Sequence, residues 1–312
     1  MNGDVKFALN GVIPALVAPI NDAGSIDFAI LEKQVKYLVS HGAHGIFVNG
    51  STGEGPLLSI SEKVDLLRVA RAAAGSEVFL VAACLAPSTE HVLREVDAMA
   101  AVGPDFVAAV TPYYYAPTQH IIIKHFRSIA AESPVPLVLY DIPSNTHSKI
   151  ALDAIVELSH EKNIAGIKDS SGDAVSFARG LIHPDIPESF SWIQGDDYLD
   201  AFSMLSGASG IVTGLGNVRL DPYVALYGAA VAGNRNAALA AQREINSLAQ
   251  IFECVGHRII PAIKAAVAFD GRCLPRMKME HHTLSAEDIE TVLAVLNGLG
   301  AGLNRAAIIE SD

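Results

Sequence analysis

Lys168 ends a short run of small and apolar residues and begins a polar turn, in the segment Ile164-Ala-Gly-Ile-Lys-Asp-Ser-Ser-Gly-Asp173. Lysine is rarely buried completely, and an ammonium group in apolar surroundings loses proton affinity and becomes an amine nucleophile. Such an amine can attack a ketone and form an imine. A lysine that only extends its side chain to solvent at the end of a strand would look the same in isolation. Residues elsewhere in the chain must distinguish these two interpretations.

Several other apolar runs also end in residues that could bind or react. The glycines and hydroxyls of residues 50–55 could direct backbone N–H groups and hydroxyls at a carboxylate, although an ordinary glycine turn has the same composition. The three tyrosines within residues 111–117 could be half-buried packing residues. The segments are Gly50-Ser-Thr-Gly-Glu-Gly55, Thr111-Pro-Tyr-Tyr-Tyr-Ala-Pro117, Tyr140-Asp-Ile-Pro-Ser-Asn145, Gly195-Asp-Asp197 and Gly214-Leu-Gly-Asn217.

These segments all follow predicted strands of one repeating pattern. Apolar strands alternate eight times with amphipathic helices over residues 11–232, which predicts a closed parallel (β/α)8 TIM barrel in the α/β class. An open doubly wound sheet is disfavoured because no Gly-x-Gly-x-x-Gly follows the first strand. The predicted strands are 11–18, 45–49, 78–82, 106–110, 137–140, 164–168, 191–194 and 210–213. The predicted helices are 28–40, 61–74 with Ser61 as its N-cap, 88–102, 118–131, 151–160, 173–181, 198–205 and 222–232.

The remaining chain is divided into an N-terminal segment, 1–10, and a C-terminal helical region, 233–312. The latter predicts a three-helix extension with helices at 235–252, 257–269 and 286–299. In a (β/α)8 barrel the active site lies at the C-terminal ends of the strands. The polar turns described above are therefore expected to meet around one cavity.

Composition narrows the class of protein further. The 312 residues carry a formal net charge of −12, which argues against nucleic acid or an anionic membrane as a partner. No apolar run approaches the ~18 residues of a membrane span, and the first ten residues do not resemble a signal peptide. Three widely spaced cysteines predict no disulfide framework, and the eleven histidines show no metal-ligand spacing. We expect a cytoplasmic protein without a metal site.

Four of the segments, in this order, resemble the dihydrodipicolinate synthase/N-acetylneuraminate lyase family. Each is weak alone, but their combination is specific and the resemblance extends over about residues 11–300. It implies a class I aldolase that uses pyruvate as donor or product through a lysine Schiff base, with no cofactor and no metal. It also implies a homotetramer, commonly a dimer of tight dimers. The segments are Gly50-Ser-Thr-Gly-Glu54, Thr111-Pro-Tyr-Tyr114, Tyr140-x-x-Pro143 and Gly166-Ile-Lys-Asp169.

The resemblance assigns roles to individual residues. Lys168 matches the lysine that forms the Schiff base, and Tyr140 matches the phenol that shuttles protons. Ser51 and Thr52 match a hydroxyl pair beside the pyruvate carboxylate, where many relatives have two threonines. Tyr114 matches a tyrosine that crosses to the neighbouring subunit and completes a proton relay. The expected catalytic residues are Lys168, Tyr140, Thr52 and Tyr114; the expected substrate-binding residues are Gly50, Ser51, Thr52, Asn145, Gly195 and Val212.

The chemistry of these residues agrees with the roles that the resemblance implies. A protonated imine on Lys168 is an electron sink for breaking or forming the bond beyond C3 of the keto acid. Tyr140 could relay protons if it is hydrogen-bonded to Thr52. The Gly-Ser-Thr-Gly loop could hold the carboxylate and so fix the angle at which C2 is presented.

One departure from the family pattern bears on the substrate. Asn145 stands where synthases of the lysine pathway usually carry an arginine that binds the carboxylate of the second substrate, and the two are not equivalent. Tyr115 likewise replaces an asparagine that is common in the synthases. Asn145-Thr146 and the sequence around Lys168 look more like the 4-hydroxy-2-oxoglutarate and 2-keto-3-deoxy sugar acid aldolases.

The alternatives rank below a keto-acid aldolase. A 4-hydroxy-tetrahydrodipicolinate synthase comes second. An N-acetylneuraminate lyase, a class that shares the Gly-Ser-Thr-Gly-Glu motif, comes third. A non-catalytic keto-acid-binding barrel is opposed by the intact Lys168, Tyr140 and Thr52. The pattern does not indicate the aldehyde, the stereochemistry or a feedback effector. Asp169, Asp196 and Asp197 could act in the site or cap the following turns.

Overall fold

The strands of the chain form one parallel sheet that curves into a barrel. The computed structural model describes residues 7–299, so residues 1–6 of the N-terminal segment and 300–312 of the C-terminal region lie outside the described residues. The strand order is β1-β8-β7-β6-β5-β4-β3-β2, with every pair parallel. The strands are β1 Gly11–Pro14, β2 Gly45–Val48, β3 Phe79–Cys84, β4 Phe106–Val110, β5 Leu137–Asp141, β6 Ile164–Asp169, β7 Ser191–Gln194 and β8 Gly210–Thr213.

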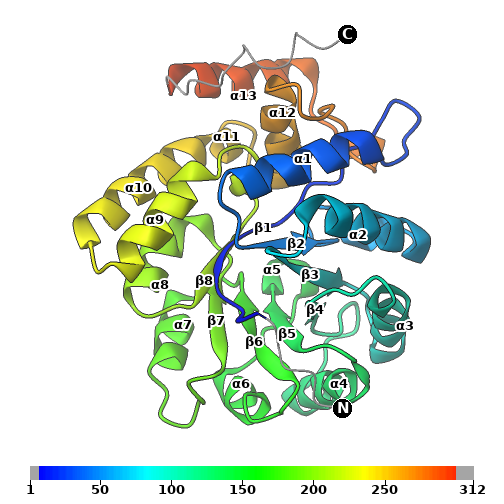
Figure 1. The fold of residues 1–312 in the computed structure, drawn as a ribbon, viewed down its shortest axis with the longest axis vertical. Helices are drawn as coiled ribbons and strands as arrows, with labels where there is room; N and C mark the ends of the chain where they lie inside the picture. The colour runs from blue at the N-terminus through cyan, green and yellow to red at the C-terminus, as the bar shows by residue number, and fades with distance from the viewer. Residues whose placement is uncertain (1–6, 300–312) are drawn as a thin grey trace.

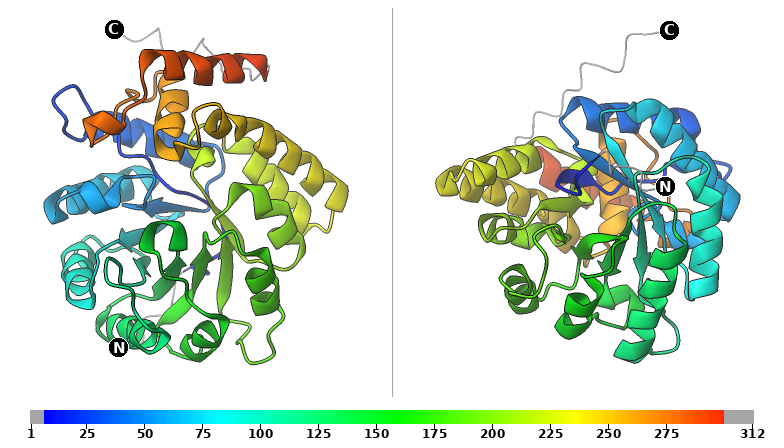
Figure 2. Two further views of the ribbon diagram at one scale, coloured as in Figure 1. Left: turned by 180° about the vertical axis from the view of Figure 1, so that it is seen from behind. Right: turned by 60° about the horizontal axis from the view of Figure 1, so that its bottom comes forward.

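Helices surround the strands on all sides, as Figures 1 and 2 show. This is the TIM barrel that the alternation of strands and helices predicts. The helices of the barrel are α1 Phe28–Ser40, α2 Ile60–Ala74, α3 Thr89–Ala100, α4 Gln119–Glu132, α5 Pro143–Thr146, α6 Leu152–Leu158, α7 Ala174–Leu181, α8 Asp200–Leu205 and α9 Asp221–Val231. The C-terminal helices are α10 Arg235–Leu248, α11 Gln250–Glu253, α12 Ile259–Phe269 and α13 Ala286–Gly298. No helix within residues 7–299 is both long and apolar enough to cross a bilayer.

Two apolar layers hold the barrel together. Side chains on the outer face of the strands pack against the helices in a large core. A second cluster fills the barrel interior and includes Ile13, Phe47, Phe106, Ile193 and Val212. Successive strand residues point alternately inward and outward, so strands buried on both faces read as continuous apolar runs. That is why the eight strands are recognisable in the sequence.

The barrel closes between β1 and β2 by a single bridge. Ala15 pairs with Phe47, and the N–H of Leu16 donates to the carbonyl of Phe47 at 2.9 Å. On the other side of β1, the buried Asn217 side chain donates to the carbonyl of Ala15 at 2.7 Å and accepts from the N–H of Val17 at 3.2 Å. A side chain therefore replaces strand pairing where β1 ends.

Residues of the C-terminal region bind parts of the barrel that are distant in sequence. Arg272 donates to the carbonyl of Asn217 at 2.6 Å and to the side chain of Gln34 at 2.8 Å. Lys264 on α12 forms a buried ion pair with Glu54, whose other oxygen accepts from the N–H of Lys278 at 2.9 Å. In Figure 1, α12 and α13 lie together at one side of the barrel.

Three local predictions about the helices need correction. Ser59, not Ser61, caps α2: its side chain accepts from the N–H of Glu62, and Glu62 bonds back to Ser59 in a capping box. The predicted helix 235–252 is divided after Leu248 into α10 and the short α11. The predicted helix at 198–205 begins as a 3-10 turn, Asp197–Leu199, before α8.

Candidate active site

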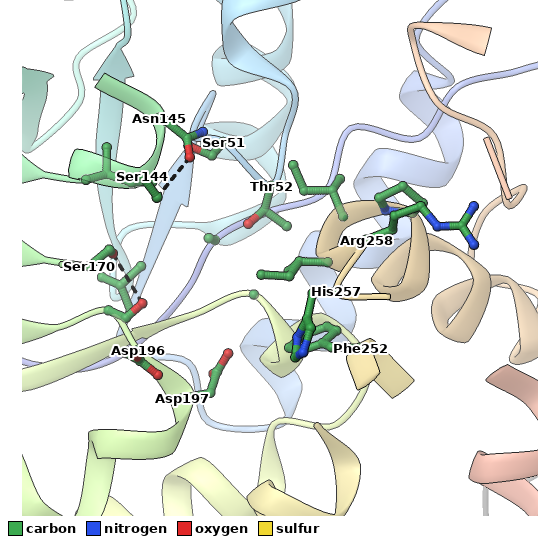
Figure 3. Close-up of a pocket in the computed structure, with 18 of the residues that line it drawn as sticks. Ser51, Thr52, Ser144, Asn145, Ser170, Asp196, Asp197, Phe252, His257 and Arg258 are labelled. Atoms are coloured by element: carbon green, nitrogen blue, oxygen red, sulfur yellow. Dashed lines mark hydrogen bonds between the residues drawn. The ribbon is translucent and has the colours of Figure 1, made fainter. Parts of the chain in front are cut away.

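A cavity of about 700 Å³ opens at the C-terminal ends of the strands. Seven of the residues expected to act in the site line it: Ser51, Thr52, Tyr140, Asn145, Lys168, Gly195 and Val212. Two expected residues do not: Gly50 lies in the loop behind Ser51, and Tyr114 is exposed elsewhere. Figure 3 shows the polar members of this lining on facing loops. The barrel thus brings together residues up to 161 positions apart, from Ser51 to Val212.

Lys168 lies on β6 beside Tyr140 on β5, because the strand register pairs these two residues. Its Nζ atom is 3.8 Å from the centre of the Tyr140 ring and 4.7 Å from that of Phe47. The residue is only 6% exposed, yet it lines the cavity. Aromatic faces can hold an ammonium ion without removing its access to a ligand. Lys168 is therefore a buried amine that a molecule in the cavity can reach.

The hydroxyl of Tyr140 is within 3.4 Å of the Ser51 hydroxyl. The hydroxyl partner that a proton relay through Tyr140 needs is therefore Ser51 in this structure, where the sequence suggested Thr52. The Thr52 hydroxyl instead faces Gly214, where an added Cβ would lie 3.3 Å from it. The two adjacent hydroxyls therefore have different neighbours, Tyr140 for Ser51 and Gly214 for Thr52.

The turns after β6 and β7 support each other next to Lys168. The N–H of Gly195 donates to the carbonyl of Asp169 at 2.8 Å, and the Ser170 hydroxyl donates to the carbonyl of Gly195 at 3.2 Å. A Cβ at Gly195 would lie 2.2 Å from the Ser170 hydroxyl oxygen and 3.1 Å from Cε of Lys168. Glycine at this position leaves the space that the lysine side chain occupies.

Asp196 and Asp197 have different environments. Asp196 caps the 3-10 turn by accepting from the N–H of Tyr198 at 3.1 Å. Asp197 accepts from the hydroxyls of Thr213 at 2.6 Å and Tyr223 at 2.7 Å. Burial raises the pKa of Asp197 to about 6, while the two hydroxyls and Lys168 oppose that rise. In Figure 3 its carboxyl group points into the cavity, which adds an acidic group to the site.

Asn145 is presented on the short helix α5, and an ion pair anchors the loop that carries it. Lys149 donates to the buried Asp141 carboxylate at 3.0 Å and to the Ser171 hydroxyl at 2.9 Å. Burial raises the pKa of Asp141 to about 6 although Lys149 opposes the shift. The Ser144 hydroxyl donates to the side-chain oxygen of Asn145 at 3.1 Å. An uncharged amide therefore stands at this edge of the cavity.

The tyrosine loop after β4 points away from the cavity of its own chain. Tyr113 anchors the loop through a hydrogen bond of 3.1 Å from its hydroxyl to the carbonyl of Leu85. Tyr114 has a left-handed backbone with φ of 77°, and it is 86% exposed. Its ring packs edge-on against Tyr115 with centroids 5.0 Å apart. A non-glycine residue rarely adopts positive φ, so the loop holds this exposed ring in a costly conformation.

One wall of the cavity comes from the C-terminal region, which sequence reasoning did not include in the site. Its residues are Phe252, His257, Arg258, Ile259, Ile260, Pro261, Met277, His281 and His282. In Figure 3 the Arg258 guanidinium points away from the cavity. It donates to Asp288 at 2.8 Å and to the carbonyl of Val255 at 2.9 Å. The apolar start of α12 was visible in the sequence, but nothing there indicated which loops it faces.

Residues 7–299 contain no group of three or more histidines, cysteines or acidic residues placed to hold a metal ion. The arrangement places an accessible amine next to a phenol and several hydroxyls. Glycine-containing turns leave room for a small ligand beside the amine.

Comparison with known proteins gives a consistent result. The model of the dihydrodipicolinate synthetase family matches residues 8–295. A protein of Methanosphaerula palustris named 4-hydroxy-tetrahydrodipicolinate synthase is 32% identical over 92% of this chain and 98% of its own. An uncharacterised DapA-like lyase of Halobacterium salinarum is 32% identical over 78% of this chain and 79% of its own. The crystal structure of chloride-inhibited dihydrodipicolinate synthase from Acinetobacter baumannii, complexed with pyruvate, superposes with a TM-score of 0.87. It is 27% identical and covers 94% of this chain and 99% of that one.

Proposed function

Because this chain belongs to the dihydrodipicolinate synthetase family of pyruvate-dependent class I aldolases and lyases, we propose that Lys168 forms its Schiff base with pyruvate. The substrate is a 4-hydroxy-2-keto acid of the 4-hydroxy-2-oxoglutarate or 2-keto-3-deoxy sugar acid type. The observation that carries the proposal is the Lys168 amine, buried against the Tyr140 ring at 3.8 Å and open to the cavity.

In the cleavage direction, Nζ of Lys168 attacks the C2 carbonyl of the keto acid and water leaves. The resulting iminium draws electrons from the C3–C4 bond as the C4 hydroxyl loses its proton, which gives an aldehyde and an enamine. Tyr140 accepts that proton while its own phenol proton passes to the Ser51 hydroxyl and from there to water, and the same relay in reverse delivers a proton to C3 of the enamine. Hydrolysis of the pyruvate imine then releases pyruvate and the free lysine. The condensation direction runs through the same steps in reverse.

Two hydroxyls assist at different atoms. The Ser51 hydroxyl lies 3.4 Å from that of Tyr140, accepts the phenol proton from it and passes the proton to water. Thr52 and the backbone N–H groups of the loop that begins at Gly50 bind the keto-acid carboxylate, which fixes the angle of C2 to Lys168. No group other than the covalent imine is required for these steps.

Asn145 supports the keto-acid aldolase over its alternatives. An amide cannot replace the bidentate binding of a second carboxylate by a guanidinium. The second candidate is 4-hydroxy-tetrahydrodipicolinate synthase, and it is favoured by the names of relatives about 30% identical. An N-acetylneuraminate lyase and a non-catalytic keto-acid-binding barrel rank lower.

We further propose that the enzyme is a homotetramer, a dimer of dimers, in which Tyr114 completes the site of the neighbouring subunit. Its exposure and positive φ support a role outside its own chain. The unpaired Cys84, Cys254 and Cys273 are consistent with a reducing compartment, so we place the enzyme in the cytoplasm. Its net charge of −12 supports no nucleic-acid partner.

Borohydride reduction in the presence of pyruvate tests the mechanism. Peptide mass spectrometry is expected to find a reduced pyruvyl adduct on Lys168, absent from Lys168→Ala and retained in Lys124→Ala, which removes an exposed lysine. Labelling at another lysine, or none, contradicts the proposal.

Substrate assays then separate the candidates. Pyruvate release from 4-hydroxy-2-oxoglutarate, 2-keto-3-deoxygluconate and N-acetylneuraminate distinguishes the lyases. Condensation of pyruvate with aspartate semialdehyde identifies a synthase. Adduct formation without turnover of any of these compounds favours the binding-protein alternative.

A further inference from the structure

We propose that the aldehyde half of the substrate is uncharged and ends in an apolar chain or ring. This inference rests on the Schiff-base function proposed above and narrows its 4-hydroxy-2-keto acid substrate. It disfavours both 4-hydroxy-2-oxoglutarate, whose aldehyde product carries a carboxylate, and the sugar acids, whose aldehyde product carries several hydroxyls. It favours a 2-keto-3-deoxy acid that is apolar beyond the hydroxyl-bearing carbon. The argument starts from the wall of the cavity formed by the C-terminal region.

The lining of the cavity combines hydroxyl groups from the barrel turns with apolar side chains from the C-terminal region. Its hydroxyl groups include those of Ser51, Thr52 and Ser170, on the turns that follow β2 and β6, and these three residues are labelled in Figure 3. The C-terminal wall contributes a buried phenylalanine, a buried methionine and the apolar first turn of α12. Its apolar members are Phe252, Ile259, Ile260, Pro261 and Met277.

The volume of the cavity exceeds what pyruvate needs. At about 700 Å³ it lies in the upper half of the range of pockets that hold drug-sized ligands, about 300–1,000 Å³. With C2 bound to Lys168 and the carboxylate to the Ser51-Thr52 turn, the remaining lining, which includes the C-terminal wall, is left for the rest of the substrate. Burying apolar atoms there is favourable, at about 25 cal/mol per Å².

The charges around the cavity oppose a second carboxylate. Asp196 and Asp197 both line it. Arg258 is the only arginine among the lining residues and is already bound to Asp288 at 2.8 Å and to a backbone carbonyl. The positive charge of the Lys168 iminium lies next to C2, beside the keto acid's own carboxylate. A second carboxylate would therefore be desolvated near acidic groups and without a strong cationic partner, which is unfavourable.

The first turn of α12 and the three lining histidines, His257, His281 and His282, all of which are exposed, do not change this conclusion. The N–H of Ile259 donates to the carbonyl of His257 at 2.9 Å, and Pro261 has no N–H, so two donors of the helix N-terminus are not offered to an anion. His281 and His282 are exposed at the rim and pack on each other with ring centroids 4.6 Å apart.

The test is condensation of pyruvate with four aldehydes: hexanal, benzaldehyde, glyoxylate and glyceraldehyde. Product formation is followed by mass spectrometry at fixed pyruvate. We expect kcat/KM for hexanal or benzaldehyde to exceed that for glyoxylate by at least about tenfold, the effect of a well-formed apolar subsite. A preference for glyoxylate or glyceraldehyde overturns the inference.

A substitution at the wall makes the test specific. Ile259 is 48% exposed, so Ile259→Thr is expected to fold. It should raise KM for hexanal about tenfold with little change in kcat, because it removes binding shared by ground state and transition state. The matched control is Ile182→Thr, at a residue that is 80% exposed at the end of α7.

The outcomes separate the two proposals. If Ile259→Thr slows all four aldehydes equally, or if the control has the same effect, the apolar subsite is refuted while the aldolase mechanism stands. If borohydride traps no pyruvate on Lys168 in the unmodified protein, the proposed function itself fails and this inference fails with it.

Discussion

The Glu54–Lys264 ion pair should be essential to stability although it lies outside the reacting atoms. Its side chains are 2% and 1% exposed. Lys264 also donates to the carbonyl of Arg276 at 2.9 Å, and Glu54 accepts from the N–H of Lys278 at 2.9 Å. Glu54→Gln leaves the ammonium group buried without a counter-charge. Breaking such a pair by removing one partner costs about 3–5 kcal/mol.

The expected effect is large enough to measure by thermal unfolding. For a long chain, each kcal/mol lost from the free energy of unfolding lowers Tm by about 2 °C. Glu54→Gln should therefore lower Tm by about 6–10 °C. Trp192 is a convenient probe, since it is the only tryptophan and is buried against Phe177 with ring centroids 5.4 Å apart. Fluorescence should report the transition without an added label.

The double variant Glu54→Gln/Lys264→Met is the decisive comparison. Replacing both charges removes the desolvation penalty, so the double variant should be clearly more stable than Glu54→Gln alone. Arg68→Met, which breaks an exposed ion pair with Asp65, is the control and should change Tm little. The reasoning would be refuted if Glu54→Gln lowered the free energy of unfolding by less than about 1 kcal/mol, or if the double variant were no more stable than the single variant.

Three further predictions concern the cavity. Ser51→Ala should lower kcat for carbon–carbon bond cleavage about 10- to 100-fold while the pyruvate adduct still forms, because only the neighbour of the Tyr140 hydroxyl at 3.4 Å is lost. Gly195→Ala should abolish or strongly reduce adduct formation, since its Cβ would lie 3.1 Å from Cε of Lys168 and force the side chain to move. Asp197 should ionise as pH rises through about 6 and then stabilise the positively charged iminium. The pH profile of kcat/KM should therefore rise near pH 6, and Asp197→Asn should lose that inflection.

Each of these predictions has its own control. Thr52→Val should weaken pyruvate binding more than it affects proton transfer, the opposite pattern to Ser51→Ala. Gly228→Ala places a Cβ in open space on α9 and should leave adduct formation unchanged. An inflection near pH 6 that persists in Asp197→Asn would assign it to another group.

Sequence reasoning recovers the barrel because its signals are local. A strand buried on both faces must be apolar throughout, so the runs ending at Val110 and Thr213 are visible without knowing their neighbours. Helix ends are harder, since several residues can cap. Ser59 and Ser61 are both plausible caps of α2, and only the reciprocal bond with Glu62 chooses between them.

The site is recovered where it depends on strand ends and missed where it depends on packing. Lys168 and Tyr140 are adjacent because strand register places them so, and the barrel rule anticipates that. The partner of Tyr140 depends on how one turn rotates, and sequence does not distinguish the hydroxyls of Ser51 and Thr52. The contribution of Phe252 depends on where a distant helix docks, for which no periodicity provides a signal.

The contacts made by the last part of the chain also constrain how the protein is synthesised. Lys264 neutralises Glu54, and Arg272 binds the backbone carbonyl of Asn217 next to the seam beside β1. A nascent chain that has emerged only as far as α9 has all eight strands. The Glu54 carboxylate, which is buried in the finished protein, and the seam beside β1 then still lack Lys264 and Arg272. We therefore expect the barrel to remain loosely closed on the ribosome and to consolidate only after Arg272 has left the exit tunnel.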